Sequence, residues 1–387
     1  MQTTKMLVLA MACAAIRFSD IAAQEPAGRE AGAEDTVKIA QVALRRGLDW
    51  LKSAQRPDGS WSDTNFPALT ALGLWAFARS DHPARQEVCS KAAEFVALYA
   101  QPDGGIYKPA TAGRGSGGLS VYNTAVCMTA LHAWDPAKYR ALILKAREFM
   151  AGSQLVGDSP GAGGFGYEPP RPRADEARRL MERGDLSNTA WAMRAMRETQ
   201  NAEDYREGAG KVDIDWAATI RFIEKLQNRD ADDPENFGSF GYEPGGERGG
   251  TAQGKDGKVT LRGYGSMTYA ALEAMIFAQL TREDPRVRSA LEWASRHWSV
   301  DENPGMGLKG LFYYYNTMSK ALTVAGADAL TPPDGRTVPW KEQLVRKIAA
   351  LQKPDGSWVN EDNQFWEGNP ALVTSYAALA LEYILGR

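Results

Sequence analysis

Aromatic side chains precede several of the apolar helical segments of this sequence. The densest run, Leu311 to Asn316, reads Leu-Phe-Tyr-Tyr-Tyr-Asn, and Tyr122-Asn123 and Tyr264 stand at similar places. The face of an aromatic ring attracts cations and packs on apolar chains, so such residues could stabilise a carbocation, bind a polyene or stack on a sugar. Packing in the core is the alternative for any one of them. The residues expected to bind a ligand are Tyr122, Asn123, Ser187, Asn188, Trp191, Tyr264, Tyr313, Tyr314, Tyr315, Asn316 and Trp366.

Carboxylates that could transfer protons lie in the connections between helices. The pentapeptide Phe-Gly-Tyr-Glu-Pro occurs at 165–169 and again at 240–244, which places Glu168 and Glu243 in equivalent positions. Asp301-Glu302 and Glu367 are further candidates for acid–base work. The alternative is that each accepts loop hydrogen bonds, and no spacing pairs them. Asn123, like the other asparagines that open helical segments, is first of all a candidate helix N-cap.

The sequence predicts neither a metal site nor a cofactor. Its histidines are too scattered in the sequence to form a ligand set: His82, His132 and His297. Cys89 and Cys127 could form one disulfide or stay as two buried thiols on helices. The 45 Lys and Arg against 48 Asp and Glu give a net charge of −3, which argues against a nucleic-acid partner because such proteins carry a basic excess.

A repeat organises the chain. Gln55-Arg-Pro-Asp-Gly-Ser-Trp61 returns as Gln352-Lys-Pro-Asp-Gly-Ser-Trp358, and weaker copies begin near Gln101, Gln154, Gln227 and Trp298. Each of the six units begins with a helix that mixes apolar and charged residues and is stopped by a turn rich in Pro, Asp and Gly. A second helix, apolar on nearly every side, follows. These second helices are expected at 68–77, 123–134, 188–196, 269–280, 316–325 and 375–385.

A helix that is apolar all round must be covered all round. Six such helices inside six amphipathic ones satisfy this as two concentric rings, so the sequence predicts an all-α (α/α)6 toroid over residues 36–387. Strands are not expected, because alternating runs are absent. The long connections, at 101–121, 154–187 and 227–266, all lead into the inner helices. They therefore predict a mouth at the inner helices' N-terminal ends.

The string Arg46-Gly-Leu-Asp-Trp-Leu-Lys-Ser-Ala-Gln-Arg-Pro-Asp-Gly-Ser-Trp61 resembles the QW motif of squalene-hopene cyclases. The six units are similar to the toroid that these cyclases share with protein prenyltransferase β-subunits and thioester-containing complement domains. The resemblance covers about Asp35 to the C-terminus. It implies that Gln55 and Gln352 cap a neighbouring helix and that Trp61 and Trp358 stack beside them.

The resemblance also implies a place for the cyclase acid. These cyclases protonate a double bond or epoxide with an Asp-x-Asp-Asp-Thr-Ala string, and the corresponding place here is Asp185-Leu-Ser187-Asn188-Thr-Ala. Ser187 replaces the carboxylate that acts as the acid, and Asp185 is the surviving acidic residue. Asp230-Ala-Asp232-Asp233 spells the pattern, but it follows an outer helix and is expected to be a solvated loop. The zinc ligands of prenyltransferases and the Cys-Gly-Glu-Gln thioester motif have no counterpart.

The N-terminus predicts export. An apolar stretch from Met6 to Ile16 follows Lys5 and leads to Ala22-Ala23, which is typical of a signal peptide over residues 1–23. A flexible spacer over 24–35 and no transmembrane segment after cleavage are expected.

Three functions remain open. The first is a terpene-cyclase-like protein that binds an apolar, isoprenoid-type molecule in its mouth. The second is a non-catalytic scaffold for a peptide or protein partner. The third is a carbohydrate-active toroid that uses Tyr and Glu residues.

Overall fold

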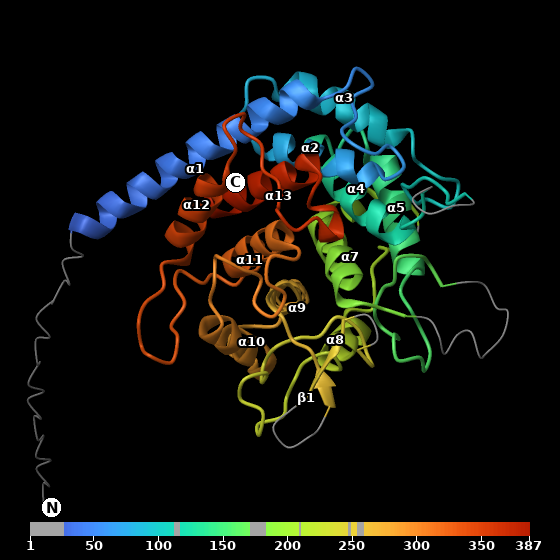
Figure 1. Cartoon of the computed structure of the whole chain (residues 1–387). Coiled ribbons are helices and arrows are strands. Elements are labelled where there is room, and N and C mark those ends of the chain that lie inside the picture. Colours follow the sequence, from blue (N-terminus) through green and yellow to red (C-terminus); the bar gives the residue numbers. More distant parts are fainter. Residues whose placement is uncertain (1–26, 112–116, 171–182, 209, 247–248, 254–258) are drawn as a thin grey trace, which may run out of the picture.

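The computed structural model describes residues 27–387 except 112–116, 171–182, 209, 247–248 and 254–258. The expected signal peptide, 1–23, lies outside the described residues. Over the described part the chain forms two concentric rings of six helices each (Figure 1). The inner ring consists of α2 (Pro67–Arg79), α4 (Ser120–Trp134), α7 (Leu186–Glu198), α9 (Gly265–Phe277), α11 (Leu311–Val324) and α13 (Pro370–Ile384). The outer ring consists of α1 (Ala27–Ala54), α3 (Arg85–Ala97), α5 (Arg140–Gly152), α8 (Trp216–Glu224), α10 (Pro285–Arg296) and α12 (Trp340–Leu351). The (α/α)6 toroid expected from the sequence is confirmed.

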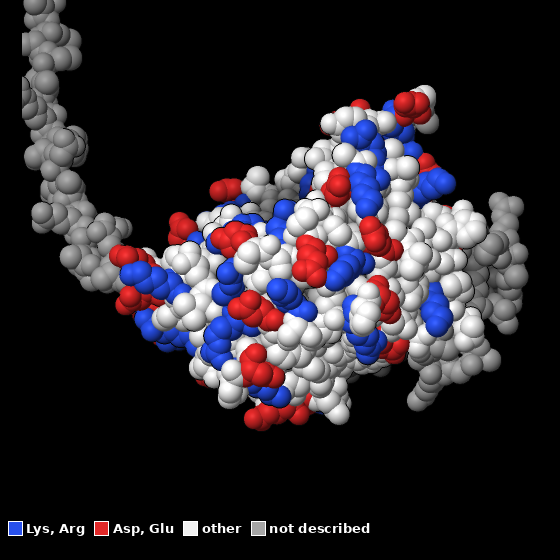
Figure 2. All heavy atoms as spheres, turned by 90° about the horizontal axis from the view of Figure 1, so that it is seen from above, with Lys and Arg blue, Asp and Glu red and all other residues white. Residues whose placement is uncertain are grey.

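The inner ring is closed. Each inner helix contacts the next one along the chain, and α13 returns to contact α2. Most side chains of these helices are buried, as in the stretch from Ala68 to Ala78 of α2, which is apolar apart from Thr70. The outer helices mix charged with apolar residues, and acidic and basic side chains are interspersed over the face shown in Figure 2. The hydrophobic effect therefore stabilises mainly the inner ring, whereas the outer helices keep one face in contact with water.

The repeated turn clasps each unit to the next. At the seam, the Gln352 side chain donates to the carbonyls of Gly356 in its own turn and of Ala43 in α1, both at 2.9 Å. Trp358 is fully buried and donates from its indole to Ile348, 2.7 Å away. The sixth unit is therefore bonded to the first, which is how the ring closes.

The same clasp recurs around the ring. The side chains of Gln55, Gln154 and Gln227 donate to backbone carbonyls of the following outer helix or its N-cap residue, and Trp298 takes this role in the fifth unit by donating to Gln343 at 2.7 Å. Gln101 is the exception, since it bonds within its own turn. The capping role that the resemblance implied for Gln55 and Gln352 becomes, in the structure, a bond to a neighbouring outer helix.

The glycine of this turn cannot carry a side chain. Gly356 has φ +96°, and a Cβ there would lie 2.5 Å from the carbonyl oxygen of Arg46 in α1. We expect Gly356→Ala to lower the free energy of unfolding by more than about 3 kcal/mol, because about 1–2 kcal/mol of left-handed strain adds to a backbone clash at the seam. Gly335→Ala is the matched control, since Gly335 has φ +76° and no neighbour within 4 Å. Equal losses in urea denaturation would contradict this assignment of the seam.

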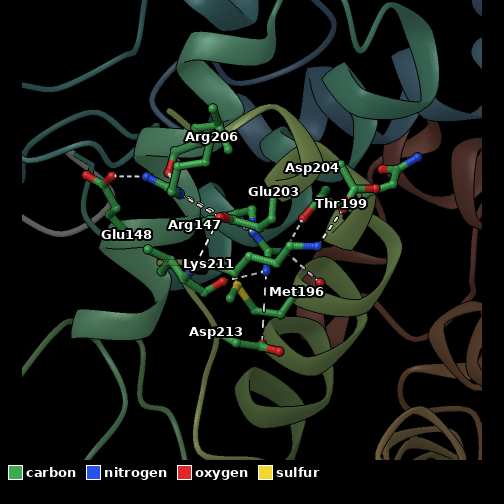
Figure 3. Close-up of polar contacts among 12 residues, drawn as sticks. Arg147, Glu148, Met196, Thr199, Glu203, Asp204, Arg206, Lys211 and Asp213 are labelled. Atoms are coloured by element: carbon green, nitrogen blue, oxygen red, sulfur yellow. Dashed lines mark hydrogen bonds and ion pairs between the residues drawn. The ribbon is translucent and has the colours of Figure 1, made fainter. Parts of the chain in front are cut away.

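A second tie holds the third and fourth units together (Figure 3). Arg147 of α5 is fully buried and donates to Glu203 at 2.7 Å, Thr199 Oγ1 at 2.8 Å and the Met196 carbonyl at 2.7 Å. Glu203 also accepts from Arg206 and from the Val212 N–H, and these donors hold the pKa of its carboxyl down at about 2. The carboxylate is thus charged and fully bonded inside the fold.

This tie predicts an acid-labile contribution to stability. Because the pKa of Glu203 is depressed in the folded state, its contribution is complete above about pH 5 and is lost as the pH falls toward 2. Glu203→Gln should lower the free energy of unfolding at pH 7 by about 3 kcal/mol, because it removes the buried counter-charge of Arg147 and leaves it paired with the partly exposed Asp213, 4.0 Å away. Glu148→Gln removes an exposed partner of Arg206 and should cost less than about 1 kcal/mol. A Glu203→Gln protein as stable as the wild type would refute the assignment.

Three expectations change or resolve. Helix α1 begins at Ala27, so the range 24–35 expected as a spacer is helical from Ala27 on, and its Glu34–Lys38 pair (2.7 Å) has the i,i+4 spacing that supports a helix. One short antiparallel hairpin, β1 (Thr251–Gln253) with β2 (Val259–Leu261), occurs where no strand was expected. Cys89 and Cys127 are buried free thiols, so the disulfide alternative is wrong.

Candidate functional site

At the start of each of the six inner helices, a side-chain oxygen accepts from a backbone N–H of the first turn or, for α4, of the residue just before it. Backbone N–H groups at a helix start lack partners within the helix, and side-chain oxygens satisfy them. The accepting residues, each with one bonded N–H group, are Asn123 for α2 (Ala68, 3.0 Å), Glu168 for α4 (Leu119, 2.7 Å), Asp185 for α7 (Asn188, 2.9 Å), Asn303 for α9 (Ser266, 2.9 Å), Glu367 for α11 (Tyr313, 2.7 Å) and Asn369 for α13 (Ala371, 3.0 Å). The polar residues that stood out in the sequence are therefore largely caps.

Asp185 is not among the described residues that line the cavity at the mouth. Its carboxylate is fully buried and accepts from the backbone N–H of Asn188 and, at 2.8 Å, from the side-chain amide of the same residue. The structure therefore gives this carboxylate a capping role, and the catalytic role expected from the sequence stays a prediction. The residue resembles the first Asp of the cyclase string in sequence, but in space it starts α7.

The loop carboxylates act in the same way. Glu168 accepts from Leu119 N–H and from the Ser120 hydroxyl. Glu367 accepts from the N–H groups of Phe312 and Tyr313 and from the Asn360 amide, and burial raises the pKa of its carboxyl to about 7. Of the other acid–base candidates, Glu243 is buried, whereas Asp301 is exposed and paired with Lys347 at 2.6 Å.

A cavity of about 530 Å³ opens at the N-terminal ends of the inner helices. Every inner helix contributes to its wall, together with the connections that lead into these helices. The aromatic lining residues are Phe66, Tyr122, Tyr167, Trp191, Tyr242, Tyr264, Tyr313, Phe365, Trp366 and Tyr376; the others are Leu69, Ser187, Asn188, Gly249, Arg262, Ser266, Met267, Asn303, Met306, Lys309, Gly310 and Leu372. The mouth expected from the loop lengths is present.

Seven of the expected ligand-binding residues line this cavity: Tyr122, Ser187, Asn188, Trp191, Tyr264, Tyr313 and Trp366. They interlock, because Tyr122 meets Trp191 edge-on at 5.8 Å and the Ser187 hydroxyl lies 3.1 Å from that of Tyr313.

Four expected residues do not line it. Successive residues of a helix point about 100° apart, so of the run from Tyr313 to Asn316 only Tyr313 faces inward. The hydroxyls of Tyr314 and Tyr315 donate instead to the carbonyls of Ser299 and Val300, and Asn316 is fully buried. The fourth, Asn123, caps α2 from within the core.

Several lining residues were missed. Tyr376 lies on a helix assigned to the inner ring but was not singled out, and its hydroxyl is 3.3 Å from that of Tyr122. In the repeated pentapeptide only the Glu was considered as a functional residue. Its Tyr residues, Tyr167 and Tyr242, line the cavity, and their hydroxyl oxygens are 3.1 Å apart. The doubled motif was the available signal for both.

The wall holds neutral phenols and two cations. No Asp or Glu is among the described residues that line the cavity, whereas Arg262 and Lys309 are. Burial raises the pKa of Tyr122 to about 12 and also raises the pKa of Tyr376 well above its ordinary value, so these hydroxyls stay protonated near pH 7. Among the described lining residues there is therefore neither a carboxylate nor an ionised phenol to transfer a proton near pH 7.

Ion pairs fill the inner ring beyond Trp191. Arg194 is buried under that ring, with its guanidinium carbon 4.5 Å from the ring centre, and makes a two-pronged bond with Glu273. Lys320 forms an ion pair with Glu198 at 2.7 Å, and the Arg79 guanidinium lies 3.6 Å from the carboxylate of the buried Glu382. These residues belong to the later turns of their helices, so the cavity lies on the side of the helix starts.

The described residues contain no cluster of His, Cys, Asp or Glu able to hold a metal ion. Asp230 and Asp232 lie in the loop after α8, where the Asp230 carboxylate accepts from the Asp232 N–H. In the same described part, no helix has both the length and the apolar character needed to span a bilayer.

Comparison with known proteins supports the fold. The type II terpene cyclase MstE from Scytonema is similar over 91% of this chain and 98% of its own, with a TM-score of 0.54 and 13% identity. A GH76 α-mannanase from Bacteroides thetaiotaomicron is similar over 90% and 97%, with a TM-score of 0.54 and 11% identity. The GH76A α-1,6-mannanase of Salegentibacter has a TM-score of 0.53, 11% identity and coverage of 90% and 99%. No family model and no curated protein sequence matches the chain.

The capping assignment of Asp185 can be tested by stability. Asp185→Ala should lower the free energy of unfolding by about 1–2 kcal/mol, because α7 loses its N-cap. Asp185→Asn should cost only a few tenths, since Asn caps equally well and the side-chain oxygen of Asn188, which has no hydrogen-bond partner, can turn to accept from the new amide. Equal losses in the two variants, measured by urea denaturation, would show that capping is not what the carboxylate does.

Proposed function

We propose that this chain binds an apolar, isoprenoid-type small molecule in the cavity at the mouth of its toroid, and that it does so after export. The observation that carries this proposal is the aromatic wall of a cavity of about 530 Å³. This volume lies within the range of small-molecule sites, which are mostly apolar with a few placed polar groups. The N-terminal sequence, Lys5 followed by Met6 to Ile16, supports export.

The fold neighbours support the ligand class at a distance. MstE is described in complex with geranylgeranyl dihydroxybenzoate, a molecule with a long isoprenoid chain. The resemblance of Arg46–Trp61 to the QW motif supports a relation to squalene-hopene-type cyclases. Both lines agree with the wall chemistry, since aromatic faces pack well on polyenes.

Binding without cyclisation is the form of this function that the site supports. Ser187 stands where the cyclase string has its acid, and Asp185 is used as a cap. The face of Trp191 is also occupied by Arg194, which leaves less of its π surface for a carbocation. A scaffold that binds a peptide or protein remains an alternative for the same mouth.

A carbohydrate ligand is the second candidate, favoured by the mannanase neighbours and by exposed aromatic residues at the mouth. Phe365 and Trp366 are 62% and 46% exposed and could stack on a sugar ring. Hydrolysis of a glycoside usually needs two carboxyl groups that flank the bond. The described wall offers none, so this candidate is supported as glycan binding only.

Quenching of tryptophan fluorescence by geranylgeraniol tests the proposal, because Trp191 and Trp366 lie in the wall. We expect saturable quenching by the wild type. Ser187→Phe should weaken binding about 10- to 100-fold, since overfilling a packed space costs about 1–3 kcal/mol. Ser53→Phe, on the exposed side of α1, is the matched control and should bind like the wild type.

Absence of saturable binding by the wild type would overturn the proposal, as would equal affinities of the Ser187→Phe and wild-type proteins. Saturable binding of α-1,6-mannotriose in place of geranylgeraniol would favour the carbohydrate candidate.

A further inference from the structure

We infer that the ligand is an acidic amphiphile, an apolar chain that ends in a carboxylate or phosphate held at the mouth by Arg262 and Lys309. This inference rests on the proposed function and specifies the ligand's headgroup. It starts from the charge on the wall: the two cations that line the cavity have no carboxylate beside them among the described lining residues.

Arg262 is short of partners. It follows β2 and is half-buried, and its Nη2 donates to the thioether sulfur of Met306 at 3.0 Å, while its Nε is buried without a hydrogen bond. A thioether is a weak acceptor, so the guanidinium keeps most of its donor capacity. The guanidinium carbon also lies 5.9 Å from the centre of the Tyr264 ring.

Other arginines of the fold are treated differently. Arg147 and Arg194, which are buried, each face a glutamate, and Arg197 donates to the Phe277 carbonyl. A buried charge without a partner is costly, because its lost hydration is not replaced. Arg262 therefore marks a place where an anion from outside the described chain completes the site.

Lys309 supplies the second charge. It is exposed and lines the same cavity, and its backbone N–H bonds the Met306 carbonyl at 3.3 Å, which connects it to the residue that Arg262 contacts. No ion pair of Lys309 with a described carboxylate exists. An arginine and a lysine together bind carboxylate and phosphate oxygens through charge-assisted hydrogen bonds.

The remainder of the wall suits the chain of such a molecule. Trp191 and Tyr376 lie in the part built by the inner helices, whereas Lys309 belongs to the connection that precedes α11. A ligand with its tail among the inner helices and its acid at this connection satisfies both halves of the cavity. A neutral isoprenoid would satisfy only the first.

The test compares three probes with the same twenty-carbon chain: geranylgeranoic acid, geranylgeranyl monophosphate and geranylgeraniol. Fluorescence titration should show that Arg262→Leu/Lys309→Met weakens binding of at least one acidic probe by about 10- to 100-fold, as expected for loss of charge-assisted bonds, and changes geranylgeraniol binding by less than about threefold. Raising the NaCl concentration should weaken only the acidic probes. Arg288→Leu, on the exposed outer helix α10, is the control and should leave all three unchanged.

The outcomes separate the two proposals. If all three probes bind the wild type and the double variant changes none of them selectively, the acidic headgroup is refuted while the apolar site stands. If no probe binds, the proposed function fails and this inference with it. Selective loss of the acid identifies a carboxylate ligand, and selective loss of the monophosphate identifies a phosphate.

Discussion

The fit of the sixth turn against the first helix is the constraint on which the rest of the structure depends. Gly356 brings the turn so close to α1 that a Cβ would lie 2.5 Å from the Arg46 carbonyl oxygen. Gln352 bonds across the same contact, and Arg46 donates back to the carbonyls of Lys353 and Pro354 at 3.1 and 3.0 Å. Without this seam the six units would form an open superhelix, whose end helices would expose apolar faces.

Closure has a consequence for chemistry at the mouth. It gathers six inner helix starts at one end of the ring, and each start carries backbone N–H groups that need acceptors. The chain meets this need with Asp, Glu and Asn side chains, four of which come from another unit: Asn123, Glu168, Asn303 and Glu367. Carboxylates that could have acted as catalytic acids therefore accept hydrogen bonds from helix starts. What faces the cavity is aromatic, with neutral phenols and the two cations Arg262 and Lys309.

The sequence was sufficient to predict the fold because local sequence patterns determine its helices and turns. Turns such as that of Gln352 to Trp358 repeat, and a helix that is apolar on nearly every side, such as 68–77, has to be buried. The sequence was less sufficient to predict the site, because the side chains of adjacent residues in a helix point in different directions. Tyr313 faces the cavity and Tyr314 does not, and only the rotation of α11 about its axis decides between them.

The role of Asp185 shows the same limit from another side. The motif match placed Asp185 at the start of an inner helix, which is correct. An aspartate at a helix start can cap the helix or act as a catalytic acid, and the direction of its carboxylate decides which of these it does. Arg262 was not found at all, since a lone arginine in a Gly-rich connection carries no pattern. Its role is inferred from the missing hydrogen-bond partner of its Nε among the described residues, which only a structure can reveal.

A crystal structure of the protein with geranylgeranoic acid would test the account most directly. In this structure the isoprenoid chain of the ligand should lie between Trp191 and Tyr376, and its carboxylate should be within hydrogen-bond distance of Arg262 or Lys309. A carboxylate turned toward α7 and Asp185, or a molecule bound outside the inner ring, would contradict it.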